Sequence, residues 1–373
     1  MKKRYVSLGL MSGTSGDGVD TSIIISNGLN EYESVEDKYF EYDKNIYKKY
    51  IFLREKIYNS NDLERYKSEL LNLERQITIF HAKIIKDLKI PSEDIIIGFH
   101  GQTIYHNSKE NISYQLGDGQ LLSQLVQKKI IFNFRKNDIL NGGEGAPLTP
   151  IFHQLIASQN ELLTPVCFLN IGGISNVTIV KGLKNPNEIQ SKDLGPGNCL
   201  IDGWIRKNSN KKFDKDGHIA SQGKINEIIL EQAQELYVNR INKKKLSYDI
   251  NDFDISFARG LTLEDGALTL TEFTANLLSI ELSDYISNLN LSLNSIFLCG
   301  GGRKNKVLVE KIKQNFNTST KLKSIDELKI NGDFVESQAF AFLAIRSFKN
   351  LPITFPNTTG CNVPCTGGEL IEI

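Results

Sequence analysis

The chain has 373 residues, of which 40% are hydrophobic and 24% charged, a composition typical of globular proteins that excludes a disordered chain. Its 44 Lys and Arg residues balance 44 Asp and Glu residues, so no positive excess points to nucleic acid or an anionic membrane as a partner. The length suggests two domains, and no stretch reaches the roughly 18 apolar residues that would span a bilayer.

The first half is predicted to begin with two strands over residues 4–26, joined by the glycine-rich turn of GLMSGTSGDGVD. Apolar residues spaced by three and four then predict a helix over residues 62–90. Buried strands are predicted at 95–97 and 130–134, with the stretches FHGQTIYH and QLGDGQ between them. Because strands alternate with helices, the sequence predicts an α/β protein.

The second half repeats this order, with a strand at 166–171, the glycine turn NIGGISN and a returning strand at 177–180. We interpret the repeat as two related halves. Further predicted elements are a strand at 295–298, which is followed by CGGGRKN, and three helices at 224–239, 265–289 and 333–348. We expect residues 1–150 and 335–373 to form one domain and residues 151–334 to form the other.

The five cysteines are an odd number, and three of them lie in or beside apolar, glycine-rich segments. This usage is typical of a reduced, cytoplasmic protein rather than of a disulfide framework. Cys361 and Cys365 could bind a metal or form a disulfide. No second cysteine pair or nearby histidine supports a metal site at this spacing.

Three glycine clusters follow or join predicted strands, at residues 13–18, 172–173 and 300–302. None has the Walker A pattern or opens a helix as G-x-G-x-x-G does. One such turn alone would indicate an ordinary hairpin. Three in this order predict a nucleotide site, because hairpin turns can present backbone N–H groups to a triphosphate and a glycine loop can pass close to a base and ribose.

Eleven stretches between residue 9 and about residue 360 resemble the anhydro-N-acetylmuramic acid kinase family. The most specific are MSGTSGDGVD and DLGPGN. The others are FHGQTIYH, QLGDGQ, FRKNDILNGGEGAPLTPIFH, LNIGGISNVT, IDGW, SFARGLTLEDGALTLTEFTA, CGGGRKN, VESQAFAFLA and a late TG. The resemblance implies the two-domain actin-like ATPase fold, which is ribonuclease H-like and is shared with hexokinase and Hsp70, with ATP in an interdomain cleft.

The family phosphorylates 1,6-anhydro-N-acetylmuramate with ATP, and water opens the anhydro bridge, in cell-wall recycling and amino-sugar catabolism. The resemblance implies that Asp193 is the catalytic base that activates this water, as a carboxylate does in inverting glycosidases. Read without the resemblance, Asp193 is a turn-forming residue before Gly195. The residues implied to bind ATP are Gly13, Thr14, Ser15, Gly16, Asp17, Gly18, Val19, Asp20, Gly172, Gly173, Gly195, Gly197, Asn198, Gly301, Gly302 and Asn305.

Asp17 and Asp20 are the candidates to orient Mg²⁺ or its water ligands, the alternative being a solvated hairpin turn. The residues implied to bind the sugar are Thr14, His100, Asn133, Arg135, Asp138 and Glu336. Arginine suits the lactyl carboxylate as a bidentate partner, although a surface ion pair is the alternative. The alternatives for His100 and Glu336 are a buried core histidine and a carboxylate that favours a helix N-terminus.

The chain departs from the family pattern at two places that bear on the sugar site. Asn133 stands where the family usually has an aspartate, and NKKKLSYDIN at 242–251 replaces a Pro-Pro-Lys-Ser-Thr-Gly-Arg stretch. The alternatives to the family's reaction are an ordinary sugar kinase acting on a free hydroxyl, and a non-catalytic ATP-binding switch of the same fold. We expect ATP, Mg²⁺ and an amino sugar as ligands, no nucleic acid or membrane partner, a cytoplasmic location, and a homodimer as one option.

Overall fold

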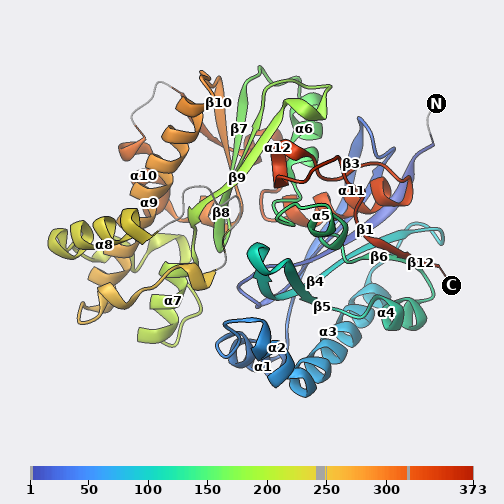
Figure 1. Ribbon diagram of the computed structural model, residues 1–373, viewed down its shortest axis with the longest axis horizontal. Coiled ribbons are helices and arrows are strands. Elements are labelled where there is room, and N and C mark those ends of the chain that lie inside the picture. Colours follow the sequence, from blue (N-terminus) through green and yellow to red (C-terminus); the bar gives the residue numbers. More distant parts are fainter. Residues whose placement is uncertain (1–2, 241–247, 249, 317–319, 373) are drawn as a thin grey trace. The chain divides into compact units, whose positions relative to one another are not determined.

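The computed structural model describes residues 3–240, 248, 250–316 and 320–372 (Figure 1). Contacts divide the chain into two compact units. Unit 1 comprises Met1–Leu162, Gly182–Gln190 and Asp333–Ile373, and unit 2 comprises Leu163–Lys181 and Ser191–Gly332. Among the described residues, no helix combines the length and the apolar character needed to cross a membrane.

Unit 1 contains a seven-stranded sheet. Its strands are β1 (Tyr5–Ser12), β2 (Gly18–Ser26), β3 (Tyr32–Glu41), β4 (Ile96–Asn107), β5 (Ile112–Leu116), β6 (Lys129–Phe132) and β12 (Glu369–Ile371). Their order is β12-β6-β4-β1-β2-β3, and β5 pairs with β4. Strands β1 and β2 form an antiparallel hairpin, while β1 and β4 run parallel, so the hairpin turn lies at the same edge as the continuation of β4.

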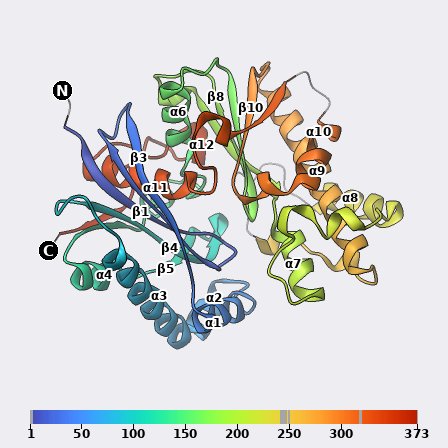
Figure 2. The same ribbon diagram turned by 180° about the vertical axis from the view of Figure 1, so that it is seen from behind.

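The helices of unit 1 are α1 (Lys44–Arg54), α2 (Ser60–Arg65), α3 (Lys67–Asp87), α4 (Gly119–Val126), α5 (Lys136–Leu140), α6 (Pro150–Gln159), α11 (Val335–Phe348) and α12 (Pro356–Thr359). Alternate residues of β1 face opposite sides of the sheet. Leu8 and Leu10 belong to the buried core with residues of α1 and α3. On the other side, a Cβ on Gly9 would lie 1.9 Å from the Ser337 carbonyl oxygen, so α11 packs directly on the strand backbone (Figure 2).

Helix α6 belongs to unit 1, although the sequence placed the boundary before it. The ring of Phe152 on this helix packs 4.8 Å from the ring of Tyr32 and 5.7 Å from the ring of Phe342 on α11, measured between centroids. These contacts tie α6 to the first sheet and to the returning helix. Unit 1 therefore extends to Leu162, not to residue 150, and also takes in Gly182–Gln190.

Unit 2 contains a five-stranded sheet of β7 (Val166–Ile171), β8 (Ile174–Val180), β9 (Ile189–Pro196), β10 (Ser295–Cys299) and β11 (Lys321–Ser324), in the order β11-β10-β7-β8-β9. Its helices are α7 (Cys199–Asn208), α8 (Glu227–Arg240), α9 (Leu263–Asn288) and α10 (Lys306–Asn315). Leu169 and Leu298 of the sheet share a core with Leu270 of α9 and Leu308 of α10. Short 3-10 helices occur in both units, at Ser108–Glu110 and Pro186–Glu188 in unit 1 and at Lys215–Gly217, Ala220–Gln222, Ile250–Asp252, Ser256–Ala258, Gly301–Lys304 and Ile325–Leu328 in unit 2.

Both sheets use the same arrangement, an antiparallel hairpin whose first strand pairs in parallel with a later strand. In unit 1 these are β1, β2 and β4, and in unit 2 they are β7, β8 and β10. The α/β prediction is therefore confirmed, with helices and two sheets in one chain. The helix expected over 62–90 is divided at Tyr66 into α2 and α3, and FHGQTIYH lies within the long strand β4.

Candidate active site

The glycine-rich turn of unit 1 connects β1 to β2. The amide of Gly16 donates to the carbonyl of Gly13 at 3.1 Å, which closes the turn. Gly16 has a φ of +68°, and a Cβ there would lie 2.0 Å from the ring of Tyr50. Packing therefore already requires a glycine at this position. Gly13 differs, because the atom nearest to a Cβ at this position would be the Ser15 hydroxyl oxygen at 3.7 Å.

Two side chains on α1 hold the backbone of the turn at Thr14. The Arg54 guanidinium donates to the Thr14 carbonyl, and the Tyr50 hydroxyl lies 3.5 Å from the same oxygen. Because this carbonyl is engaged from within unit 1, the peptide plane at Thr14 is fixed. The turn is thus preorganised, which lowers the entropic cost of using its N–H groups to bind an anion.

A buried glutamine that sequence reasoning did not single out also supports the turn. Gln102 on β4 is 0% exposed, and its Nε2 donates to the Gly13 carbonyl at 2.8 Å. Its Oε1 has no partner among the described residues. A buried amide oxygen without a donor is costly, so this atom is a candidate to accept a hydrogen bond from a ligand. The only signal in the sequence was its place within FHGQTIYH.

Carboxylates gather at the start of β2 and the N-terminus of α11. The pKa of Asp20 is raised to about 8, first by burial and then by the nearby charges of Asp17, Glu336, Asp333 and Asp37. Asp20, Asp17 and Glu336 were among the site residues predicted from the sequence, but nothing in the sequence singled out Asp333 or Asp37. Carboxylates held close together in a partly buried site repel one another, so a bound cation would stabilise them. Their oxygen atoms are the kind of ligand that Mg²⁺ prefers.

Not every residue of the predicted phosphate loop presents a side chain to a ligand. Val19 is 0% exposed and belongs to the core of unit 1. Gly18 begins β2 and pairs with Glu41 of β3. The Ser15 hydroxyl donates to Asp17 Oδ1 at 2.5 Å. The turn residues 13–17 and the Asp20 carboxylate therefore remain the parts of this stretch that could contact a nucleotide or its metal.

Arg135 and His100, both predicted to bind the sugar, lie together in unit 1. The guanidinium donates from Nη1 to the Gly145 carbonyl at 2.7 Å and from Nη2 to His100 Nε2 at 2.9 Å. Burial and the adjacent guanidinium hold the pKa of His100 well below its usual value. The ring of His100 packs against Phe340 of α11, with centroids 4.6 Å apart. The histidine is therefore a neutral acceptor that orients the arginine.

The structure gives Asp138 and Asn133 partners within unit 1. Asp138 is 1% exposed, and its carboxylate accepts from the Gly145 amide at 2.7 Å and from the Thr359 hydroxyl at 2.6 Å. Asn133 has a φ of +56°, and its Nδ2 donates to Glu369 Oε2 at 3.3 Å. Asp138 thus shapes the loop that holds Arg135, and Asn133 ties the end of β6 to β12. Neither contact was predicted.

Asp193 lies in unit 2, within strand β9 rather than on a loop as the sequence had suggested. Its side chain is 6% exposed, and Oδ2 accepts a hydrogen bond from the Tyr248 amide at 2.8 Å. An N–H donor to a carboxylate stabilises its charged form, which is the form a general base needs. Most of the altered stretch 242–251 lies outside the described residues, which include from it only Tyr248, Ile250 and Asn251.

The predicted nucleotide glycines of unit 2 come together at one edge of its sheet. The amides of Gly197 and Asn198 donate to the carbonyls of Gly173 and Gly172, at 2.9 and 2.8 Å. The third cluster also reaches this point, because a Cβ on Gly302 would lie 2.2 Å from the side chain of Ile171. Strands β7 and β10 are parallel, so the turns that follow them are neighbours. All three predicted stretches of unit 2 are therefore assembled around the end of β7.

Buried polar atoms without partners among the described residues line this same edge. They include the hydroxyls of Ser175 and Tyr237. Gly197 and Gly195 are their neighbours. A Cβ on Gly197 would lie 2.8 Å from the Ser175 hydroxyl oxygen, and a Cβ on Gly195 would lie 3.1 Å from the Tyr237 hydroxyl oxygen. Sequence analysis did not identify either hydroxyl. Unsatisfied buried hydroxyls beside glycine backbone are suited to bind a polar ligand.

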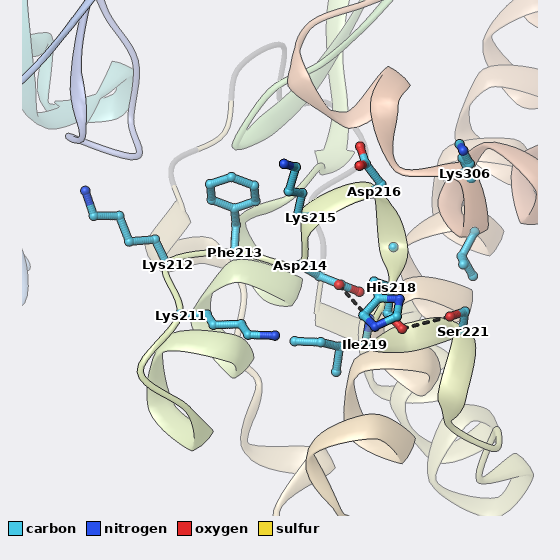
Figure 3. Close-up of a pocket in the computed structure, with 12 residues that line it drawn as sticks. Lys211, Lys212, Phe213, Asp214, Lys215, Asp216, His218, Ile219, Ser221 and Lys306 are labelled. Atoms are coloured by element: carbon cyan, nitrogen blue, oxygen red, sulfur yellow. Dashed lines mark hydrogen bonds between the residues drawn. The ribbon is translucent and has the colours of Figure 1, made fainter.

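A pocket of about 840 Å³ in unit 2 is lined by residues 211–219, Ser221, Lys306 and Val307 (Figure 3). Asn305, predicted to border the adenosine, caps α10 by accepting from the Leu308 amide at 3.1 Å, and a Cβ on Gly217 of the pocket wall would lie 2.3 Å from its Oδ1. Asp214 holds the wall by accepting from the amides of Ile219 and Ala220. The pocket residues include Lys211, Lys212, Phe213, Lys215, Asp216, His218 and Lys306.

These features define a class of protein. Preorganised glycine turns at strand ends, unpaired buried donors and acceptors, and a carboxylate cluster on an α/β scaffold are typical of proteins that bind nucleotide phosphates with a metal ion. In this chain such features occur in both units, each built on the same arrangement of hairpin and parallel strand.

Comparison with known proteins identifies the family. The sequence profile described as "Anhydro-N-acetylmuramic acid kinase" matches residues 4–372. The protein of that name from Pelagibacter ubique is 51% identical over 374 residues, covering 100% of both chains. The one from Agrobacterium fabrum is 33% identical, covering 98% of each chain. The chain belongs to the anhydro-N-acetylmuramic acid kinase family and is a kinase, as the sequence resemblance had indicated.

A solved structure is also similar over most of its length. The activator of 2-hydroxyisocaproyl-CoA dehydratase from Clostridium difficile, with bound ADPNP, matches 92% of this chain and 96% of its own, with 11% identity and a TM-score of 0.39.

Proposed function

We propose that this protein converts 1,6-anhydro-N-acetylmuramate, water and ATP to N-acetylmuramate 6-phosphate and ADP. The observation that carries the proposal is the family relationship, which extends over residues 4–372 and reaches 51% identity with one named relative. O6 of the sugar is locked in the bridge to C1, so phosphorylation of O6 requires that this bridge be opened.

Asp193 is the proposed base. It takes a proton from water as the water oxygen forms a bond to C1, and the bond between C1 and O6 breaks. O6 then forms a bond to the γ-phosphorus of ATP, ADP leaves, and Asp193 releases its proton to solvent. The phosphoryl group accepts the electron pair of O6, so no separate general acid is needed. The Tyr248 amide, 2.8 Å from Oδ2, supports this role because its N–H orients the carboxylate and favours the form that accepts a hydrogen bond.

We propose that the β1–β2 turn from Gly13 to Asp17 binds the ATP phosphates through its N–H groups, and that Gly172, Gly173, Gly195, Gly197 and Asn198 contribute from unit 2. The fixed peptide at Thr14 supports the first part of this assignment. The adenosine is assigned to Gly301, Gly302, Asn305 and the adjoining pocket, where Phe213 is half exposed.

Mg²⁺ would be held by Asp17 and Asp20, directly or through water, and it would neutralise the phosphate charges during transfer. The raised pKa of Asp20 fits this assignment, because the carboxylates around it make the place favourable for a cation. Glu336 belongs to the same cluster and would accept from a sugar hydroxyl near the metal-bound phosphate.

We assign the lactyl carboxylate of the sugar to Arg135, with His100 as the residue that positions the guanidinium. The contacts of Arg135 to Gly145 and His100 support this role, since they fix the plane of the guanidinium. Thr14 and Asn133 were also expected at the sugar. Asp138 supports the loop instead of touching the sugar in this proposal. We place the reaction in the cytoplasm, where ATP is available and the five cysteines stay reduced, as they are in the structure.

The position of the bridge oxygen after one turnover tests the reaction. Anhydro sugar labelled with heavy oxygen in the bridge is mixed with Mg-ATP and the protein, and the phosphosugar is analysed by mass spectrometry. We expect the label between C6 and phosphorus, and solvent oxygen at C1. An intact anhydro ring in the product would instead indicate an ordinary sugar kinase. Phosphate release without any phosphosugar would indicate an ATPase switch.

The variant Asp193→Asn is the matched test of the base. Its amide oxygen can still accept from the Tyr248 amide, so the fold should be retained, while turnover should fall at least about 100-fold. Glu235→Gln, an exposed position on α8, removes a charge in the same unit and should leave turnover unchanged. Full activity of Asp193→Asn would remove this residue from the mechanism.

A further inference from the structure

Three metal-ligating side chains meet in unit 1 at a place to which the proposed reaction assigns no role. Asp138 comes from α5, and Cys361 and Cys365 come from the segment between α12 and β12. One ligand atom from each lies within 4.8 Å of the others, and the residues are 1%, 1% and 3% exposed. The sequence alone gave little reason to expect a metal here, because Asp138 lies more than two hundred positions away from both cysteines.

The donor set is that of a zinc site. Two thiolates and a carboxylate suit Zn²⁺, whose bonds to sulfur and oxygen are about 2.3 and 2.0 Å long. In a tetrahedron with such bonds, neighbouring ligand atoms are roughly 3.3–3.8 Å apart. Since no two of the ligand atoms are more than 4.8 Å apart, the three side chains need only small shifts to take up this arrangement. The fourth position is left for a water molecule.

The carboxylate is already oriented by neighbouring groups. Oδ2 of Asp138 accepts from the Gly145 amide at 2.7 Å, and Oδ1 accepts from the Thr359 hydroxyl at 2.6 Å. Each carboxylate oxygen has a second lone pair, so these hydrogen bonds leave a ligand position open. Outer-shell donors of this kind are typical of metal-binding carboxylates, whose affinity they raise.

Contacts to Thr354 and Val363 hold the two cysteines. Cys361 Sγ lies 4.0 Å from the Thr354 hydroxyl, and the Cys365 thiol donates to the Val363 carbonyl at 3.0 Å. The amide of Cys365 also donates to the Thr354 carbonyl at 3.0 Å, which fixes the backbone of this cysteine. These contacts position the two sulfur atoms without a disulfide between them.

We propose that Asp138, Cys361 and Cys365 bind one Zn²⁺, which joins the C-terminal segment to the loop that holds Arg135. Binding releases the two thiol protons, and the metal bonds replace the sulfur–hydrogen bonds. The competing possibility is a disulfide between the cysteines, formed when an oxidant such as a peroxide removes both hydrogens. The proposed reaction assigns none of these three ligands to ATP or to the sugar, so either proposal can fail alone.

Cobalt substitution tests the site in the intact protein. The full chain is reduced with a phosphine, freed of metal with a chelator that is then removed, and titrated with Co²⁺. We expect saturation at one Co²⁺ per chain, with thiolate-to-metal charge transfer in the near ultraviolet and the visible bands of tetrahedral Co²⁺. Zn²⁺ should displace these bands at one equivalent. Absence of the bands in the folded, reduced wild-type protein would overturn the proposal.

Single substitutions identify the ligands. Cys361→Ser and Cys365→Ser should each weaken Zn²⁺ binding more than about tenfold and remove part of the charge-transfer band. Cys199→Ser changes a cysteine outside the cluster and should keep the wild-type spectrum. Thr359→Val, which removes only the hydrogen bond to Asp138, should lower affinity but keep the tetrahedral bands. Wild-type affinity in both ligand variants, or a stable 361–365 disulfide that forms in preference to zinc binding under reducing conditions, would also overturn the site.

Discussion

The Nε2 atom of His100 accepts a hydrogen bond from Arg135 at 2.9 Å, while its Nδ1 donates to the Gly101 carbonyl at 2.8 Å. The two contacts use both ring nitrogens and fix one neutral tautomer. Since burial and the guanidinium lower the pKa of His100 well below its usual value, the imidazole stays neutral throughout the physiological range. The pair therefore presents one fixed positive charge on Arg135.

We predict that His100→Leu raises the KM for the sugar roughly 10- to 100-fold, because a charged hydrogen bond worth about 1.5–3 kcal/mol is lost and the guanidinium is no longer held. The KM for ATP should change little. Steady-state kinetics with each substrate varied in turn measures the split. His100→Gln keeps an acceptor and should recover part of the loss. An equal effect of both variants on ATP would instead indicate a general disturbance of unit 1.

The phosphate loop can be tested at Gly13 without disturbing the fold. A Cβ at Gly13 meets nothing closer than 3.7 Å, so Gly13→Ala should unfold at nearly the wild-type temperature. If the ATP phosphates approach this backbone, the methyl group should weaken ATP binding about tenfold or more, and sugar binding should change less. Calorimetric titration with a non-hydrolysable ATP analogue measures the first effect.

Gly16→Ala is the contrasting variant. Its φ of +68° and the 2.0 Å approach to the Tyr50 ring predict a loss of at least about 2 kcal/mol in the free energy of unfolding. A nucleotide effect at Gly16 would therefore say little about phosphate binding. If Gly13→Ala binds nucleotide as the wild type does, the turn is only a hairpin.

The raised pKa of Asp20 predicts an unusual dependence of the protein's stability on pH. Its pKa is raised to about 8 in the folded protein, whereas an aspartate in an unfolded chain titrates near 3.9. Between these values the folded state holds a proton that the unfolded state has lost. The contribution of Asp20 to the free energy of unfolding is therefore fully present below about pH 4. It falls as the pH rises towards 8, by at most about 1.4 kcal/mol per pH unit.

Asp20→Asn removes this titration, so without nucleotide or Mg²⁺ the variant should unfold at a higher temperature than the wild type at pH 8, and the difference should shrink towards pH 4. Thermal unfolding followed by circular dichroism at several pH values measures it. The same variant should lose activity if Asp20 holds the metal. A variant less stable than the wild type at pH 8 would mean that the Asp20 carboxylate is not under repulsion from its neighbours.

Motifs in the sequence predicted the parts of the site that depend on backbone. The glycine turns at 13–18, 172–173 and 300–302 were recognisable because several glycines at strand ends indicate a tight turn or a close approach of the backbone. Contacts between distant side chains were not. Gln102 reaches Gly13, and Thr359 reaches Asp138, across stretches in which no local pattern records the pairing. The strand that carries Asp193 was mistaken for a loop, because Gly195 and Pro196 are typical of turns.

Asn133 provides the last prediction, since its contact changes what an aspartate there would do. Its Nδ2 donates to Glu369 Oε2 at 3.3 Å, and Glu369 also pairs with Lys136 at 2.5 Å. In Asn133→Asp a carboxylate would face Glu369 instead of an amide donor. We expect a loss of about 0.5–1 kcal/mol in the free energy of unfolding at pH 7, measured by urea denaturation, because like charges oppose each other near the surface. The loss should disappear in Asn133→Asp combined with Glu369→Gln, which restores a donor opposite the new carboxylate. If Asn133→Asp instead tightens sugar binding at unchanged stability, the side chain at 133 faces the sugar rather than β12, and the role implied by the family pattern holds.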